Sequence, residues 1–208
     1  MKILVFEYVT GGGMPAEAVT ASLYREGALM RDALLRDLAE IPGVQPVALR
    51  HARFAPMHAP PGAEWLAVGS PEEADRCFSE QIGRAGAVWP IAPESGGILE
   101  RLCLAVERAG KPLLTSPALA VRLAASKRAT ARRLEAHGIP VVPTASLERS
   151  VPPWPFPVVV KPDDGAGCEG GRRVPVRYGW SDGALCPAAQ RGQPGQCGAE
   201  QRQGGGFR

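Results

Sequence analysis

The sequence reads Pro155-Phe-Pro-Val-Val-Val-Lys161-Pro-Asp-Asp-Gly-Ala-Gly-Cys-Glu-Gly170, a short apolar run that leads into a glycine-rich loop. The β-branched run 158–160 predicts a buried strand. Lys161 follows at the end of this strand, where its ammonium group requires an anion. Glycines allow successive backbone N–H groups to surround an anion, and a lysine beside them adds a positive charge. The combination predicts a site for the phosphates of a nucleotide.

Other interpretations of this loop differ in what they require of the flanking sequence. The spacing Gly165-x-Gly167-x-x-Gly170 is that of a dinucleotide fingerprint, which opens a helix, whereas the residues after 170 break a helix at once. A P-loop is excluded because no Gly-Lys-Ser/Thr closes the motif. A protein kinase places its lysine on the strand after the loop, and here the lysine precedes it. A dinucleotide site and a solvated Asp-Gly turn between two strands are the alternatives.

The composition favours neither a polyanionic partner nor a membrane. The 208 residues are 45% hydrophobic and 22% charged, with a formal net charge of +3. No secretory or transmembrane segment is evident, so we expect a cytoplasmic protein that binds neither nucleic acid nor a membrane. The five cysteines have no CxxC spacing and the three histidines are scattered, so we expect no metal ligands in this chain.

Strands and helices alternate through the first 115 residues. We expect strands at 3–6, 44–49, 87–91 and 111–114, and helices over about 16–41, 71–82 and 98–109. This alternation implies a parallel sheet, whose ligands bind beyond the carboxyl ends of the strands. Candidate substrate-binding residues at such ends are Gly11, Gly12, Gly13 and Glu94. Close packing of helix on strand explains the glycines equally well, and Glu94 also suits a helix N-terminus.

The order of the motifs resembles the ATP-grasp superfamily. Ser126-Lys127 opens a predicted helix, a strand lysine follows at Lys161, and a glycine loop comes next, as in that superfamily. The runs Val5-Phe-Glu-Tyr-Val-Thr-Gly-Gly-Gly13 and Val88-Trp-Pro-Ile-Ala-Pro-Glu94 narrow the resemblance to the tyramine–glutamate ligase group. Relatives in that group are linked to methanofuran-type cofactor synthesis in methanogens and methylotrophs. The resemblance covers residues 1–170.

The resemblance implies an α/β protein with a parallel-sheet pre-ATP-grasp domain at 1–115. A linker helix and the first part of an ATP-grasp α+β lobe would occupy 116–170. The implied activity is that of an ATP-dependent carboxylate–amine ligase, which forms an amide through an acyl-phosphate from small amino-acid and amine substrates. ATP and magnesium would be its cofactors, and a homo-oligomer is a further expectation. The implied ATP-binding residues are Lys127, Lys161, Asp164, Gly165, Ala166, Gly167, Cys168, Glu169 and Gly170.

The composition changes at Gly171. Glycine and arginine dominate 171–208, and large apolar residues are too few for burial to offset the entropy of ordering. We expect an unpatterned tail, a reading frame shifted near this point, and a truncated, inactive ligase without the lobe that carries the magnesium ligands. A natural Gly/Arg-rich tail is the alternative, and would suit a non-catalytic nucleotide-binding or assembly protein. A Rossmann-type oxidoreductase using the turn at 11–13 is the third possibility.

A shifted frame has a consequence that the encoding DNA can test. Beyond codon 170, a neighbouring frame should encode alternating apolar strands with acids and an asparagine suited to magnesium. Early stop codons or equally unpatterned sequence in every other frame would show that the tail is natural.

Overall fold

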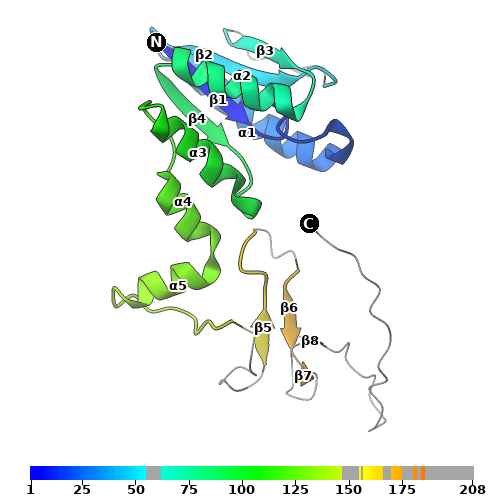
Figure 1. Cartoon of the computed structure of the whole chain (residues 1–208), viewed down its shortest axis with the longest axis vertical. Helices are drawn as coiled ribbons and strands as arrows, with labels where there is room; N and C mark the ends of the chain where they lie inside the picture. The colour runs from blue at the N-terminus through cyan, green and yellow to red at the C-terminus, as the bar shows by residue number, and fades with distance from the viewer. Residues whose placement is uncertain are drawn as a thin grey trace. The chain divides into compact units, whose positions relative to one another are not determined.

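The structure, a computed structural model, describes residues 1–54, 62–146, 155, 157–165, 170–174, 180–181 and 184–185 (Figure 1). Contacts divide the chain into two units. The first comprises Met1–Thr144 with Lys161–Gly170, and the second comprises Ala145–Val160 with Gly171–Arg208. The predicted boundaries at 115 and 170 are not tested by this division and stay a prediction.

A four-stranded parallel sheet forms the core of the first unit (Figure 1). Its strands are β1 (Lys2–Glu7), β2 (Gln45–His51), β3 (Glu64–Val68) and β4 (Ala87–Ile91), in the spatial order β3-β2-β1-β4. The chain runs from β1 outward to β2 and β3, then returns to the other side of β1 to form β4. The direction of winding therefore reverses between β1 and β4, and parallel sheets of this kind bind ligands at such a reversal.

Alternation along β1 divides the hydrophobic core between the two faces of the sheet. The covering helices are α1 (Ala21–Ala39), α2 (Pro71–Arg84) and α3 (Ile98–Arg108). Ile3 and Val5 pack in one cluster with side chains of α1, whereas Leu4 and Phe6 pack in the other with side chains of α2 and α3. Because successive strand residues point to opposite faces, the next residue, Glu7, lies on the α1 side.

The first predicted helix is divided in two by Thr20. A 3₁₀ turn, η1 (Ala16–Ala18), comes first, and α1 begins only at Ala21. Thr20 has extended backbone angles (φ −74°, ψ 157°), and its hydroxyl accepts a hydrogen bond from the Leu23 N–H at 3.2 Å. An N-cap of this kind fixes the start of a helix, so the continuous helix predicted over 16–41 is wrong at its first turn.

The parallel sheet and the α/β class predicted from the sequence are confirmed, with two differences at the edges. β3 was not predicted, because five residues with a mixed burial pattern give little periodic signal. The segment 111–114, predicted as a strand, forms only a bridge between Leu113 and Val88. Pro112 accepts a hydrogen bond there from the Val88 N–H but has no N–H of its own to extend the ladder.

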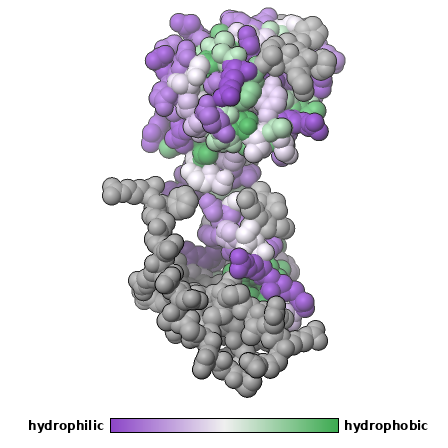
Figure 2. All heavy atoms as spheres, turned by 90° about the vertical axis from the view of Figure 1, so that its right-hand side faces the viewer, coloured by the Kyte–Doolittle hydropathy of each residue, from purple (hydrophilic) through white to green (hydrophobic). Residues whose placement is uncertain are grey.

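Two short helices continue the first unit. They are α4 (Ala118–Ala125), which packs on α3 through Cys103 and Val121, and α5 (Lys127–Glu135). Within the described part of the chain, no helix combines the length and apolar character of a membrane span. Figure 2 shows hydrophilic and hydrophobic side chains mixed over the visible face.

Short antiparallel strands make up the described part of the second unit. β5 (Val158–Val160) pairs with β6 (Arg172–Val174), and Val159 lies opposite Arg173. The strand predicted at 158–160 is therefore confirmed, but Val159 is 61% exposed rather than buried. β7 (Trp180–Ser181) and β8 (Ala184–Leu185) form a second pair. Three short strands thus lie within 171–208, most of which is outside the described residues, and the unpatterned tail stays a prediction.

The burial of side chains in the core predicts how two leucine substitutions change the free energy of unfolding. Leu102 of α3 is 1% exposed, so Leu102→Ala should lower the free energy of unfolding by about 2–5 kcal/mol. Leu119 of α4 is 77% exposed, and the matched change Leu119→Ala should alter it by no more than about 0.5 kcal/mol. Urea unfolding followed by circular dichroism measures both. Equal losses in the two variants would contradict the assignment of the core.

Candidate functional site

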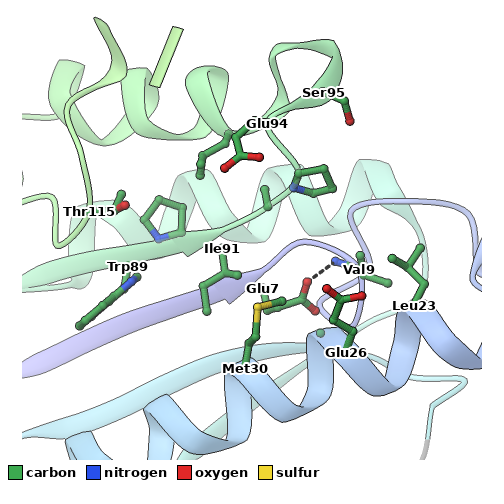
Figure 3. A pocket seen from close by; sticks show the side chains of 15 residues that line it. Glu7, Val9, Leu23, Glu26, Met30, Trp89, Ile91, Glu94, Ser95 and Thr115 are labelled. Atoms are coloured by element: carbon green, nitrogen blue, oxygen red, sulfur yellow. Dashed lines mark hydrogen bonds between the residues drawn. The ribbon is translucent and has the colours of Figure 1, made fainter. Parts of the chain in front are cut away.

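A pocket of about 540 Å³ lies at the carboxyl ends of β1 and β4 (Figure 3). Glu7 comes from the end of β1, Trp89 and Ile91 come from β4, and Glu26 and Met30 come from α1. This is the point at which the winding of the sheet reverses. The volume is within the range of about 300–1,000 Å³ that is usual for small-molecule sites.

The Glu7 carboxylate is buried at the inner end of this pocket, with 2% of the residue exposed. Its Oε2 accepts hydrogen bonds from the Thr10 N–H at 2.7 Å and the Thr10 hydroxyl at 2.6 Å. Its Oε1 accepts one from the Val9 N–H at 3.1 Å (Figure 3). These bonds close the turn after β1. Among the residues that the structure describes, Glu7 forms no ion pair.

Helix α1 passes so close to this carboxylate that only glycine fits at position 27. A Cβ built on Gly27 would lie 2.6 Å from Oε2 and 2.7 Å from Cδ of Glu7. A glycine inside a helix lowers its stability by about 0.5–1 kcal/mol relative to alanine. The close approach explains why α1 carries a glycine at this position.

The pocket lining is acidic and apolar. Three of its residues are carboxylates (Glu7, Glu26 and Glu94), and none is a lysine, arginine or histidine. Most of the remainder are apolar, with hydroxyls from Ser95 and Thr115. The field in the pocket is therefore negative, which favours a cationic ligand over an anionic one.

Only one of the four residues predicted to bind substrate lines the pocket. Glu94 lines the pocket, whereas Gly11, Gly12 and Gly13 do not. A Cβ on Gly11 would lie 2.5 Å from the Glu7 carbonyl oxygen, and one on Gly13 would overlap the Tyr8 ring. Gly12 has a φ of +87°. Each glycine thus has a packing or backbone reason to be glycine, and a role in substrate binding stays a prediction for all four residues.

A second group of polar contacts joins α5 to the loop after β5. Ser126 caps α5 by accepting a hydrogen bond from the Ala129 N–H at 3.0 Å. The Asp163 carboxylate accepts hydrogen bonds from the Ser126 hydroxyl at 2.7 Å and the Arg128 N–H at 2.9 Å. The Lys127 N–H donates to the Asp163 carbonyl at 3.0 Å. The first turn of α5 is therefore bound to a loop more than thirty residues away in the sequence.

The Lys127 side chain points into the same loop. Its Nζ donates to the carbonyl oxygens of Asp163, Asp164 and Gly165 at 3.3, 3.0 and 2.9 Å. The Asp164 carboxylate accepts a hydrogen bond from the Gly96 N–H at 3.4 Å. The structure thus brings together three of the predicted nucleotide-binding residues, and their contact with a nucleotide stays a prediction.

The other predicted nucleotide-binding residues are only partly described. Lys161 is exposed directly after β5, and Gly165 and Gly170 have φ angles of +82° and +68°. The remaining four (Ala166, Gly167, Cys168 and Glu169) lie outside the described residues. Among the residues that are described, no group of three or more His, Cys, Asp or Glu side chains is placed to hold a metal ion.

Two pKa shifts have clear causes. Hydrogen bonds from the Arg128 N–H and the Ser126 hydroxyl lower the pKa of Asp163. Burial raises the pKa of the Cys103 thiol to about 11, so this thiol is protonated at neutral pH and is no candidate nucleophile.

Sequence reasoning missed most of the pocket. Glu7, Glu26 and Trp89 were not singled out, although one signal for Glu7 is present. It ends an otherwise apolar strand and directly precedes a glycine turn. An isolated glycine within a helical pattern, here Gly27, also indicates a close approach by another part of the chain. Glu26 and Trp89 have no comparable signal, because only the fold brings them together.

These features define an α/β protein with a parallel sheet and a ligand pocket at the reversal of its winding. Residues 44–121 match the family model of the pre ATP-grasp 3 domain. The pre-ATP-grasp domain predicted from the sequence is thereby supported by a match that spans β2, β3, β4, α2 and α3 and ends within α4.

Solved structures agree with this match. An ATP-grasp superfamily protein from Archaeoglobus fulgidus is 20% identical, with a TM-score of 0.60, over 79% of this chain and 47% of that one. Pyruvate carboxylase from Rhizobium etli, solved as a variant with the allosteric activator acetyl coenzyme A, is 20% identical, with a TM-score of 0.59, over 85% of this chain and 16% of that one. No curated protein matches the sequence. The matches support the ATP-grasp superfamily at the level of fold, and the tyramine–glutamate ligase group stays a prediction.

The lowered pKa of Asp163 predicts how the stability of the loop contact depends on pH. Since folded-state hydrogen bonds lower it, the ionised carboxylate stabilises the loop contact above the unfolded-state pKa, and this contribution is lost as pH falls through the folded-state pKa. Carbon-13 NMR of the carboxyl should show Asp163 titrating below the ordinary aspartate range. Ser126→Ala should shift the value upward, because it removes one donor.

A matched control is Ser70→Ala, which removes the N-cap hydroxyl of α2 and leaves Asp163 untouched. The cause assigned to the shift would be wrong if Asp163 titrated identically in the unaltered protein and in Ser126→Ala.

Proposed function

We propose that this chain contributes the pre-ATP-grasp domain and the first nucleotide-binding segment of an ATP-dependent carboxylate–amine ligase. The observation that carries the proposal is the match of residues 44–121 to the pre ATP-grasp 3 domain. The contacts of Lys127 with the 163–165 loop agree with it, because they join two segments that the ATP-grasp resemblance assigns to phosphate binding. The chain spans less than half of the Archaeoglobus protein, so the whole activity is a proposal.

The nucleotide would be held by charge and by backbone donors. Lys127 and Lys161 would bind phosphate oxygens, and the loop from Asp164 to Gly170 would fold over them. Lys127 Nζ now donates to carbonyl oxygens, which are neutral acceptors. Phosphate oxygens are charged acceptors and form stronger bonds with an ammonium group, so they can replace the carbonyls. This exchange of acceptors at Lys127 supports a nucleoside triphosphate as the proposed ligand.

Magnesium has no assigned place in this proposal. The described residues contain no cluster suited to a metal ion, so no step is attributed to magnesium here. The chain's own contribution is to position phosphate groups and to exclude water from them.

The proposed reaction has two steps. The terminal phosphoryl group of ATP passes to a carboxylate oxygen, which gives an acyl-phosphate and ADP. The nitrogen of an unprotonated amine then attacks the acyl carbon, inorganic phosphate leaves with the electron pair of the C–O bond, and the nitrogen loses a proton. Two positively charged lysines would stabilise the phosphoryl group during its transfer.

The finer proposal is a ligase of the tyramine–glutamate type acting in the cytoplasm. It is supported only by the resemblance of runs 5–13 and 88–94 to that group. Glu94, the acidic residue of the second run, lines the pocket together with Trp89 and Ile91 of the same run, and its contact with a substrate is part of the proposal.

The lysine roles can be tested by nucleotide binding. In the 208-residue chain, Lys161→Ala should weaken ATP binding by about 1.5–3 kcal/mol, and Lys127→Ala somewhat less, because each removes a charge-assisted phosphate contact. Isothermal titration calorimetry measures the affinity, and thermal unfolding should show that both variants remain folded.

Lys2→Ala is the matched control, since Lys2 is exposed on β1 and pairs with Glu64. Unchanged ATP affinity in both loop-lysine variants, or an equal loss in the control, would reject the proposed nucleotide site.

A further inference from the structure

We propose that the contact between α5 and residues 163–165 is autoinhibitory. It occupies Lys127 in the nucleotide-free chain and has to open before a phosphate group can bind there. The proposal rests on the proposed function, because it describes how that same nucleotide site is regulated. It adds that Asp163, which is outside the predicted nucleotide-binding set, controls the affinity of the site. Three observations carry the proposal.

The first observation is that the Lys127 ammonium group has all its donors engaged. An ammonium group has three N–H donors and no acceptor. Nζ donates to the carbonyl oxygens of Asp163, Asp164 and Gly165 at 3.3, 3.0 and 2.9 Å, so the acceptors are as many as the donors. A phosphate oxygen can therefore bind Lys127 only by displacing at least one of these carbonyls.

The second observation is that Asp163 holds these carbonyls in place. Its carboxylate accepts hydrogen bonds from the Ser126 hydroxyl at 2.7 Å and the Arg128 N–H at 2.9 Å. Its carbonyl oxygen accepts one from the Lys127 N–H at 3.0 Å as well as the one from Nζ. The three residues 126–128 at the start of α5 are thus all bonded to Asp163. Removal of its carboxylate should loosen the carbonyls around Lys127 without removing a group that is predicted to touch a nucleotide.

The third observation is the contrast between the two lysines predicted to bind phosphate. Lys127 and Lys161 are both exposed residues, so neither is hidden by burial. Among the described residues, the loop carbonyls accept hydrogen bonds from the Lys127 ammonium group and not from that of Lys161. The engagement of Lys127 is therefore a property of the contact with 163–165.

The contact is weak enough for a nucleotide to open it. Its polar groups are exposed, and hydrogen bonds of this kind make modest net contributions. Carbonyl oxygens are also weaker acceptors for an ammonium group than charged phosphate oxygens are. A ligand that binds only the open state has its apparent affinity reduced in proportion to the fraction of molecules that is open. Loosening an inhibitory contact should therefore raise ATP affinity, whereas loosening a contact that preorganises the site should lower it.

The reactivity of the lysine amines tests the contact in the absence of nucleotide. The acetyl ester of N-hydroxysuccinimide acetylates accessible amines, and peptide mass spectrometry gives the rate at each lysine of the 208-residue chain. We expect Lys127 to react at least about fivefold more slowly than Lys161, and Asp163→Ala to remove most of that difference. Lys111 is the internal control. Its Nζ donates to two backbone carbonyl oxygens near the end of α2 at 2.9 Å, so it should react slowly in both chains.

ATP affinity tests whether the contact inhibits. Calorimetric titration should show that Asp163→Ala binds ATP about three- to tenfold more tightly than the unaltered chain, because a larger fraction of it is open. Asp163→Asn keeps an oxygen that can accept the Arg128 N–H, so its gain should be smaller. This second variant also keeps the test decisive if Asp163→Ala fails to fold.

Asp75→Ala is the matched control for the change in net charge. Asp75 is an exposed residue of α2, and its removal eliminates the same negative charge without altering the contact. It should change ATP affinity by less than about twofold, because exposed charges contribute modestly.

Three results would overturn the inference. Acetylation of Lys127 as fast as that of Lys161 in the unaltered chain would show that the ammonium group is not engaged. Unchanged or weaker ATP affinity in both Asp163 variants would show that the contact does not inhibit. Absence of ATP binding in every chain would overturn the proposed nucleotide site and its inhibition together. The first two results leave the nucleotide site standing, so the two failures are distinguishable.

Discussion

Burial of the Glu7 carboxylate against α1 is the constraint on which the ligand-facing end of the first unit depends. The carboxylate fixes the turn after β1 through the N–H groups of Val9 and Thr10, and it excludes any side chain at position 27. The helix can approach β1 closely only because Gly27 has no Cβ. A buried carboxylate is costly unless it is compensated, and the hydrogen bonds from Val9 and Thr10 supply that compensation.

The sheet topology places the Glu7 carboxylate at the pocket. β1 is flanked by β2 on one side and β4 on the other, so the end of β1 lies at the middle of the reversal. Residues of α1, β4 and the segment after β4 line the same pocket. The lining residues include Leu23 and Thr115, which are far apart in the sequence. Lys127, Asp164 and Gly165, which are predicted to bind a nucleotide, lie in the same unit around α5 and the 163–165 loop.

Sequence reasoning anticipated the fold better than the pocket, for a physical reason. Apolar periodicity and caps are local, so β1, α2 with its Ser70 cap, and α3 could all be predicted from their own residues. The edge strand β3 is short and mixed in burial, and it gave no such signal. Pocket residues such as Glu26 and Trp89 are brought together by strand order, which no local pattern encodes. Lys127 could be predicted as a nucleotide-binding residue because its motif has a fixed order along the chain, and this role stays a prediction.

The cap of α5 has a mechanical consequence. Its first turn is satisfied partly by Ser126, which accepts a hydrogen bond from the Ala129 N–H, and partly by the Asp163 side chain, which accepts one from the Arg128 N–H, so the start of the helix depends on the loop. An anion arriving at the positive end of this helix would compete for the same Arg128 N–H and would displace Asp163. Departure of the aspartate would also release the carbonyls that now hold the ammonium of Lys127. Binding of one anion at the start of α5 would therefore disturb the contacts of both the Asp163 carboxylate and the Lys127 ammonium group.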